Sequence, residues 1–158
     1  MCLNVFLGVH SPITIQGASF APLGMAPANR TPPPLQQFPF VYYIGQDDGD
    51  GDLGCSCLLA QHVEWRQNGP IVHADPLADN SDQCPFNALR SLVTIALQSN
   101  QPVALACDDS DDMAQKCDAE DYDHSIIHPD MITPNCYLFA DPVAVFPWRV
   151  FFLTNTSQ

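Results

Sequence analysis

The sequence contains few basic residues: five Lys and Arg stand against 18 Asp and Glu, which gives the 158-residue chain a formal charge of −13. These five are scattered along the chain, at Arg30, Arg66, Arg90, Lys116 and Arg149. Binding to nucleic-acid phosphates or to anionic membrane surfaces needs clustered Lys and Arg. We therefore expect no nucleic acid and no membrane among the partners, whereas a basic protein or peptide would suit the charge. The sequence leaves the oligomeric state open.

Long apolar runs are also missing, since none approaches the roughly 20 residues that span a bilayer. No basic residue precedes Arg30, so the positive start of a secretory signal is absent. The seven cysteines are odd in number, which favours thiols or metal ligands over disulfides. We expect a cytoplasmic protein. Because 46% of the residues are hydrophobic and only 15% are charged, we expect the chain to fold, as a single domain over residues 1–158.

Several catalytic motifs are absent from the sequence: the G-x-S-x-G nucleophile elbow, the phosphate-binding loop with its lysine, and the C-x-x-C redox pair. We therefore expect a small, soluble, acidic module that is not an enzyme. One alternative is a protein-interaction domain without metal, which would use an exposed sheet edge or the proline-rich connection. A small cysteine-dependent enzyme stays open as an alternative, with Cys107 as nucleophile and one of the five histidines as its base.

Two acidic runs are candidates for cation binding. In the run Asp47–Asp52, counted as a calcium loop from Asp48, the sixth and twelfth positions hold Leu53 and Leu59 instead of Gly and Glu. In the second run, Asp108–Asp112, no phosphate-binding glycine loop accompanies the carboxylates. We expect both runs to be solvated loops.

The pattern of apolar residues predicts mostly strands and one clear helix. The helix begins near Ser81 or Asp82, ends near Asn100, and carries one apolar stripe made of Phe86, Leu89, Val93, Ala96 and Leu97. Strands are expected at Cys2–Val9, Phe38–Ile44, Cys55–Ala60, Val103–Cys107, Tyr137–Ala140 and Trp148–Leu153.

The remaining segments are expected to be connections. His10–Gln37 is rich in proline and reads as a surface connection, with room for a short strand at Ile13–Ile15; Ser110–His128 is a polar loop. The segment His62–Asn80 is ambiguous, and Trp65 or the pair Ile71–Val72 would suit a further short strand. The sequence thus predicts an α+β fold: a mostly antiparallel or mixed sheet, one main helix packed on one face, and proline-rich surface loops.

Four cysteines form the most specific candidate site. If Cys55-Ser56-Cys57 is extended, the two thiols point to the same face and can reach one soft ion such as zinc. Cys2 begins the first predicted strand and Cys107 ends another, so the two lie at the same end of the sheet if these strands are antiparallel neighbours. We therefore predict a structural zinc held by Cys2, Cys55, Cys57 and Cys107. The competing interpretation is that these cysteines are ordinary core thiols.

Short blocks of the sequence also resemble a family of short bacterial proteins that have no assigned activity. The blocks are Met1-Cys2-Leu3, Val41-Tyr42-Tyr43-Ile44-Gly45, Gly54-Cys55-Ser56-Cys57 and Ala106-Cys107-Asp108. Members of that family begin Met-Cys-Leu and carry Tyr-Tyr-x-Gly, followed closely by Gly-Cys-x-Cys. The resemblance covers a small part of the chain and implies no mechanism; it does imply that the same four cysteines matter. The chain departs from the pattern by its acidic stretch between Gly45 and Gly54, and by Asp108-Asp109 in place of an aromatic residue.

Overall fold

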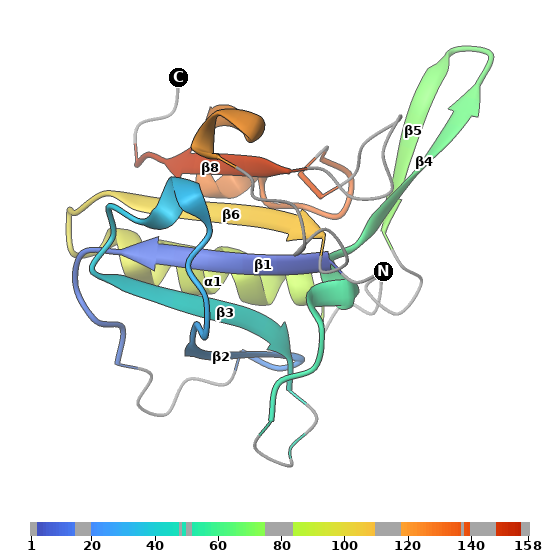
Figure 1. Cartoon of the computed structure of the whole chain (residues 1–158). Coiled ribbons are helices and arrows are strands. Elements are labelled where there is room, and N and C mark those ends of the chain that lie inside the picture. The colour runs from blue at the N-terminus through green and yellow to red at the C-terminus, as the bar shows by residue number, and fades with distance from the viewer. Residues whose placement is uncertain are drawn as a thin grey trace.

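The computed structural model describes residues 3–14, 20–47, 49, 52–74, 84–109, 118–136, 138–139 and 148–155. A six-stranded sheet has the order β2-β3-β1-β6-β8-β7, and a separate two-stranded sheet pairs β4 with β5 (Figure 1). The strands are β1 (Leu3–Val9), β2 (Leu23–Pro27), β3 (Phe40–Gln46), β4 (Gln61–Arg66), β5 (Gly69–Ala74), β6 (Val103–Asp109), β7 (Asp123–Ile127) and β8 (Arg149–Leu153). Among the described residues, no helix is long and apolar enough to cross a membrane.

The large sheet is mixed and is built around β1. This strand pairs antiparallel with β3 on one side and with β6 on the other, where Val5 lies opposite Cys107 and Leu3 opposite Asp109. Among the described strand pairs, only that of β7 with β8 is parallel. The antiparallel contact between β1 and β6 is the one that the cysteine hypothesis assumed.

The α-helix α1 (Pro85–Leu97) covers one face of the large sheet (Figure 1). All five residues of its predicted apolar stripe are buried, so both the helix and its orientation toward the sheet are confirmed. The helix begins at Pro85, at the first helical position, with Cys84 before it. The proposed capping residues, Ser81 and Asp82, lie outside the described residues.

The two faces of the sheet carry two separate apolar clusters. Along β6, Leu105 and Cys107 point to the helix side, while Ala104 and Ala106 point to the opposite face. There they pack with Leu35 from the proline-rich connection and with Phe38, which directly follows it; part of the connection forms the short 3-10 helix η1 (Pro33–Leu35). The connection crosses the sheet in the foreground of Figure 1 and serves as its second cover.

Four predicted elements differ from the structure. The predicted strand Cys55–Ala60 is instead the 3-10 helix η2 (Ser56–Leu59), and the proline-rich connection contains β2 but no strand at Ile13. The polar segment near residue 125 forms β7, whose first four side chains are exposed. Because an edge strand pairs through its backbone, β7 lacks the apolar signature that reveals an inner strand. In the predicted strand 137–140, Leu138 and Phe139 lie in a bend, and its other two residues are not described.

Candidate functional site

The hairpin formed by β4 and β5 stands away from the two packed layers of the protein (Figure 1). Its pairs run from Gln61 opposite Ala74 at the root to Arg66 opposite Gly69 at the tip, so the loop has two residues. Gly69 has φ +110°, a conformation that residues with a Cβ rarely adopt. Asn68-Gly69 is a strong hairpin signal. It could have resolved the ambiguity over residues 62–80.

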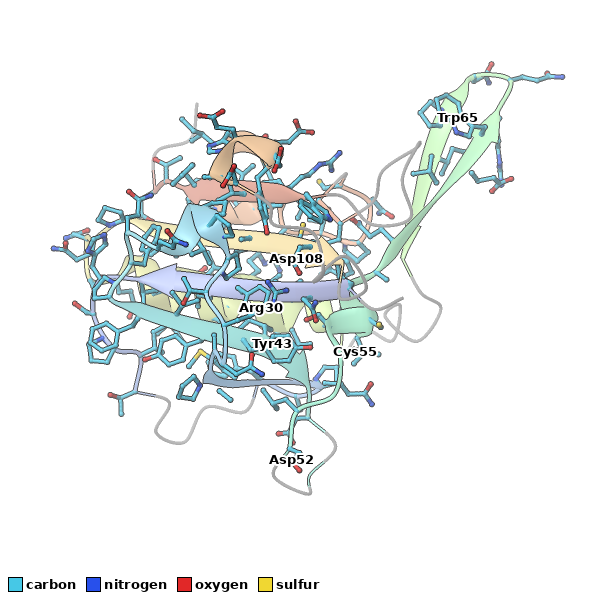
Figure 2. The ribbon with its side chains drawn as sticks, in the orientation of Figure 1. Arg30, Tyr43, Asp52, Cys55, Trp65 and Asp108 are labelled. Atoms are coloured by element: carbon cyan, nitrogen blue, oxygen red, sulfur yellow. The ribbon has the colours of Figure 1, made fainter. Side chains whose placement is uncertain are left out.

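Trp65 is the most exposed large apolar side chain among the described residues, at 65%. It shares a face of the hairpin with Val63, which is half-buried, and lies opposite Pro70, which is exposed. Figure 2 places Trp65 on the projecting hairpin, well away from Asp108 and Cys55. An open hollow of about 680 Å³ is lined by the eight residues Glu64–Ile71. Tryptophan is enriched among the few residues that carry most of the binding energy of an interface.

The charges of the described hairpin tip cancel one another. Arg66 donates two parallel hydrogen bonds to Glu64, Nε to Oε1 at 2.9 Å and Nη2 to Oε2 at 3.0 Å. The Glu64 carboxylate raises the pKa of the Arg66 guanidinium above its ordinary value. The two side chains are about half exposed, so their pairing adds little to stability. Its main effect is to leave the described tip without net charge on an acidic protein.

Gln61 anchors the root of the hairpin to the loop that precedes β8. The side chain is 3% exposed, and its amide nitrogen donates to the carbonyls of Pro134 at 2.7 Å and Thr133 at 3.5 Å. Its amide oxygen accepts from the backbone N–H groups of Phe139 at 2.9 Å and Leu138 at 3.2 Å. Both the donor and the acceptor side of one buried amide are therefore used to fix the direction in which the hairpin leaves the body.

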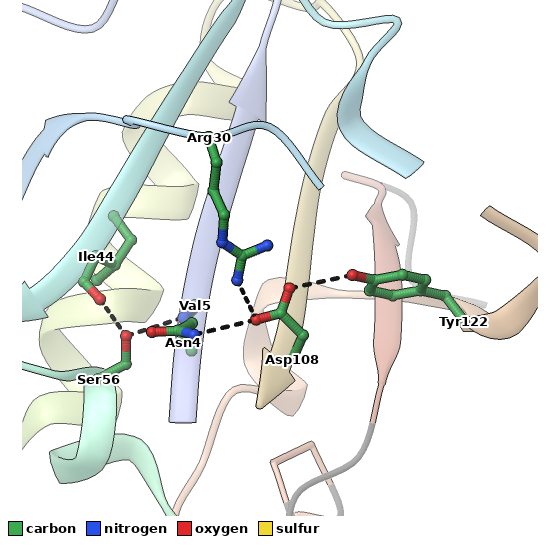
Figure 3. Close-up of polar contacts among 7 residues, drawn as sticks. All are labelled: Asn4, Val5, Arg30, Ile44, Ser56, Asp108 and Tyr122. Atoms are coloured by element: carbon green, nitrogen blue, oxygen red, sulfur yellow. Dashed lines mark hydrogen bonds and ion pairs between the residues drawn. The ribbon is translucent and has the colours of Figure 1, made fainter. Parts of the chain in front are cut away.

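Asp108 forms a buried polar cluster on the face of the sheet opposite α1 (Figure 3). Its side chain is buried and accepts hydrogen bonds from Arg30 at 2.5 Å, Tyr122 at 3.1 Å and Asn4 at 3.2 Å. The guanidinium carbon of Arg30 also lies 4.6 Å from the centre of the Phe6 ring. The prediction of a solvated loop is therefore wrong for Asp108. The sequence missed the cluster because Arg30, its charged partner, is 78 residues away.

This cluster is a structural clamp in its present arrangement. The carboxylate receives a donor from three separate segments and so ties the proline-rich connection and the Tyr122 turn to the sheet. Its described members are Asp108, Arg30, Tyr122 and Asn4, and none of these is a cysteine, serine or histidine that would serve as a nucleophile or base. We assign it to stability.

Ser56, between the two cysteines of the C-x-C sequence, is the residue that positions this segment. It is fully buried, its hydroxyl accepts from the backbone N–H of Val5 at 2.9 Å, and it donates to the carbonyl of Ile44 (Figure 3). The hydroxyl thus bridges β1 and β3, and the chain turns into η2 rather than adding a strand. Cys55 and Cys57 are half-buried on either side of it. The expectation that an extended strand presents both thiols to one face is therefore wrong.

Cys107 is a buried core thiol on the helix side of β6. Its exposed fraction is zero, and burial raises the pKa of its thiol to about 12, against an opposing contribution from Arg149. A thiol with this pKa is protonated at neutral pH and is a poor nucleophile. Of the other described cysteines, Cys84 is buried, and Cys55, Cys57 and Cys136 are half-buried.

The cysteine set that was predicted to bind zinc is brought together only in part. Val5 lies opposite Cys107 and donates to Ser56, so the C-x-C segment and Cys107 lie near the same end of β1. Within the described residues, however, no three His, Cys, Asp or Glu side chains are grouped so as to hold a metal ion. Cys2 lies outside the described residues. The zinc site therefore stays a prediction.

The acidic turn after β3 is described only in part. The Asp47 carboxylate accepts from the backbone N–H of Gly49 at 2.9 Å, and Asp47 forms an isolated bridge with Leu53. This local bond is typical of a tight turn. Asp48, Asp50 and Gly51 lie outside the described residues.

In comparisons with known proteins, no family model matches the chain, and no curated protein or solved structure matches it either. The resemblance to short bacterial proteins that begin Met-Cys-Leu therefore stays a prediction.

Proposed function

We propose that the protein is a non-enzymatic interaction module that binds a protein or peptide partner through the β4–β5 hairpin. The single observation that carries this proposal is the exposed Trp65 on a hairpin that projects from the body. An isolated two-stranded hairpin is marginally stable in water. A partner that covers the Trp65 face would remove from water an apolar surface that the described residues leave open.

The fixed root of the hairpin supports a binding function, because a rigid segment binds at a lower entropic cost than a flexible loop. Binding by a flexible segment costs the entropy of ordering it, whereas a segment held in one conformation has already met that cost. The four hydrogen bonds of Gln61 fix the hairpin at its base. The two-residue loop of Gln67 and Asn68, followed by Gly69 at positive φ, closes it at its tip.

Charge indicates which partners suit the surface. The chain carries a net charge of −13, and two of its five basic residues, Arg30 and Arg66, are paired with carboxylates of the same chain. A basic partner is therefore attracted at long range, and an acidic one is repelled. The expectation of a basic protein or peptide partner stands as part of this proposal.

The test is a selection from a random peptide library displayed on phage, carried out in parallel on the wild-type protein and on Trp65→Ala. The proposal predicts that related sequences are enriched on the wild type and lose at least tenfold in affinity on the variant. Ile126→Ala is the matched control, because Ile126 is equally exposed, at 63%, but lies on β7 of the large sheet. Peptides that bind wild type and Trp65→Ala equally well would overturn the proposal.

A further inference from the structure

We propose that the hairpin binds its partner by strand addition: a basic, extended segment pairs with the outer edge of β4 and packs its apolar residues against Trp65. This inference rests on the function proposed above and specifies the mode of binding and the chemistry of the partner. It follows from the register of the hairpin, from Pro70, and from the distribution of charge.

The register decides which backbone groups of β4 face outward. A two-residue loop makes Arg66 and Gly69 a hydrogen-bonded pair. Hydrogen-bonded and non-hydrogen-bonded pairs alternate along an antiparallel ladder, so Trp65 and Pro70 form a non-hydrogen-bonded pair, and Val63 belongs to the next one. In such pairs the N–H and C=O groups point away from the partner strand. The outer edge of β4 therefore offers the backbone groups of Val63 and Trp65.

These outward groups have the spacing that an added strand requires. Among the described residues, no backbone hydrogen bond outside the hairpin involves Val63 or Trp65. Two donors and two acceptors two residues apart match the repeat of an antiparallel neighbour. Exposed edges with unpaired backbone groups are templates for pairing with another chain.

Pro70 makes the two edges of the hairpin unequal. It lies in β5 at an outward-facing position and has no N–H, so a strand added along β5 would lose a hydrogen bond there. The edge of β4 has no proline from Gln61 to Arg66. Strand addition is therefore directed to the outer edge of β4. Side chains of the added strand then lie beside Trp65 on one face of the hairpin.

The occupant is a basic segment rather than a second copy of this chain. Two copies, each with a charge of −13, repel each other, while a segment rich in Lys or Arg is attracted. In an added strand every second side chain reaches the face of Val63 and Trp65, and the ring of Trp65 is a favourable surface for both aliphatic and cationic groups. The pairing of Arg66 with Glu64 keeps the one described cation of the tip neutralised.

The probe for the test is a fluorescein-labelled decapeptide of alternating lysine and valine. We expect it to bind the wild-type protein at micromolar concentrations, at least tenfold more weakly to Trp65→Ala, and unchanged to Ile126→Ala. Two control peptides separate the contributions of charge and of backbone pairing. A peptide of alternating glutamate and valine reverses the charge. The lysine–valine peptide with alternate backbone nitrogens methylated lacks the outward backbone donors but keeps every side chain. Strand addition predicts that each control peptide binds at least tenfold more weakly.

Amide hydrogen exchange supplies an independent readout. Strand addition slows exchange at the outward N–H groups of Val63 and Trp65 more than at the inward N–H of Glu64. Strand addition is wrong if the methylated peptide binds as tightly as the unmethylated one, or if protection of the amide groups does not alternate along β4. In that case, a displayed peptide whose binding depends on Trp65 would still support the proposed function. If no displayed peptide depends on Trp65, the proposed function itself fails.

Discussion

Replacing Gln61 by alanine tests whether the hairpin is fixed at its root. Three of the four hydrogen bonds of Gln61 are 3.2 Å or shorter, at 2.7, 2.9 and 3.2 Å. At about 1 kcal/mol net for each, their loss should lower the free energy of unfolding by about 3 kcal/mol. The loss is larger if the N–H groups of Leu138 and Phe139 stay dry, because a buried donor without a partner costs roughly 1–3 kcal/mol.

The assay is urea denaturation of the wild type, of Gln61→Ala and of a matched control, Gln67→Ala. Gln67 is the same residue type in the exposed hairpin loop, so its replacement should change stability by less than about 0.5 kcal/mol. A third variant, Gln61→Glu, keeps the acceptor but turns a carboxylate toward the carbonyls of Thr133 and Pro134. Burial beside two carbonyls raises the pKa of that carboxyl, so Gln61→Glu should be less stable than Gln61→Ala at pH 7 and should recover as the pH falls.

Two outcomes would refute this reasoning. One is a loss below about 1 kcal/mol for Gln61→Ala, since each hydrogen bond is worth about that much. The other is an equal loss for Gln67→Ala, which would show that the buried root is energetically no different from the exposed tip.

Four further predictions concern the body of the protein. Asp108→Ala should lower the free energy of unfolding by about 2–3 kcal/mol in the same denaturation assay. This is less than the roughly 3–5 kcal/mol expected for breaking a fully buried pair, because the Arg30 side chain is 29% exposed and can reach water. An unchanged denaturation midpoint would contradict the structural role of Asp108. Cys107 should resist iodoacetamide in the native protein at pH 8 while Cys55 and Cys57 react, and mass mapping of a labelled Cys107 would contradict its burial. Because burial raises the pKa of this thiol from 9.0 to about 12, it ionises first in the unfolded chain, so stability should fall as pH rises above 9, and Cys107→Ala should reduce that fall. If Cys2, Cys55, Cys57 and Cys107 hold zinc, elemental analysis of protein purified without chelator should find about one zinc per chain, and fully stable, metal-free protein would contradict the site.

The sequence predicted the elements whose signals are local. The stripe from Phe86 to Leu97 marked the helix, and the apolar runs marked β1, β3, β6 and β8. β1, β6 and β8 bury most of their residues, and α1 buries its apolar stripe, so their hydrophobic period or continuity is visible in a single segment. The α+β class followed from them.

The sequence could not reveal features that depend on partners distant along the chain. Cys55–Ala60 has the apolar character of a strand, but the Ser56 hydroxyl takes backbone partners from both β1 and β3 and turns the segment into η2. Asp108 looked solvated because its neighbours in sequence are acidic, while the guanidinium that balances it comes from Arg30. Long-range hydrogen bonds of this kind override local preference.

The hairpin is a different case, because a local signal was present. Asn68-Gly69 marked the turn, and in β4 Val63 and Trp65 alternate with polar residues, but in β5 the residues Pro70, Ile71 and Val72 follow one another without alternation. The sequence could not show that Trp65 is exposed, because a tryptophan in a strand is usually buried. Its exposure is the observation that makes the hairpin a candidate site.

The central claim, that the Trp65 face of the hairpin is where a partner binds, can be tested by fluorescence. The chain has two tryptophans, so Trp148→Phe leaves Trp65 as the only one. Titration of this variant with a peptide selected on the wild-type protein should shift the emission to shorter wavelength as the ring leaves water, with a midpoint equal to the dissociation constant measured independently. Saturating binding with the emission of Trp65 unchanged would show that the partner binds elsewhere.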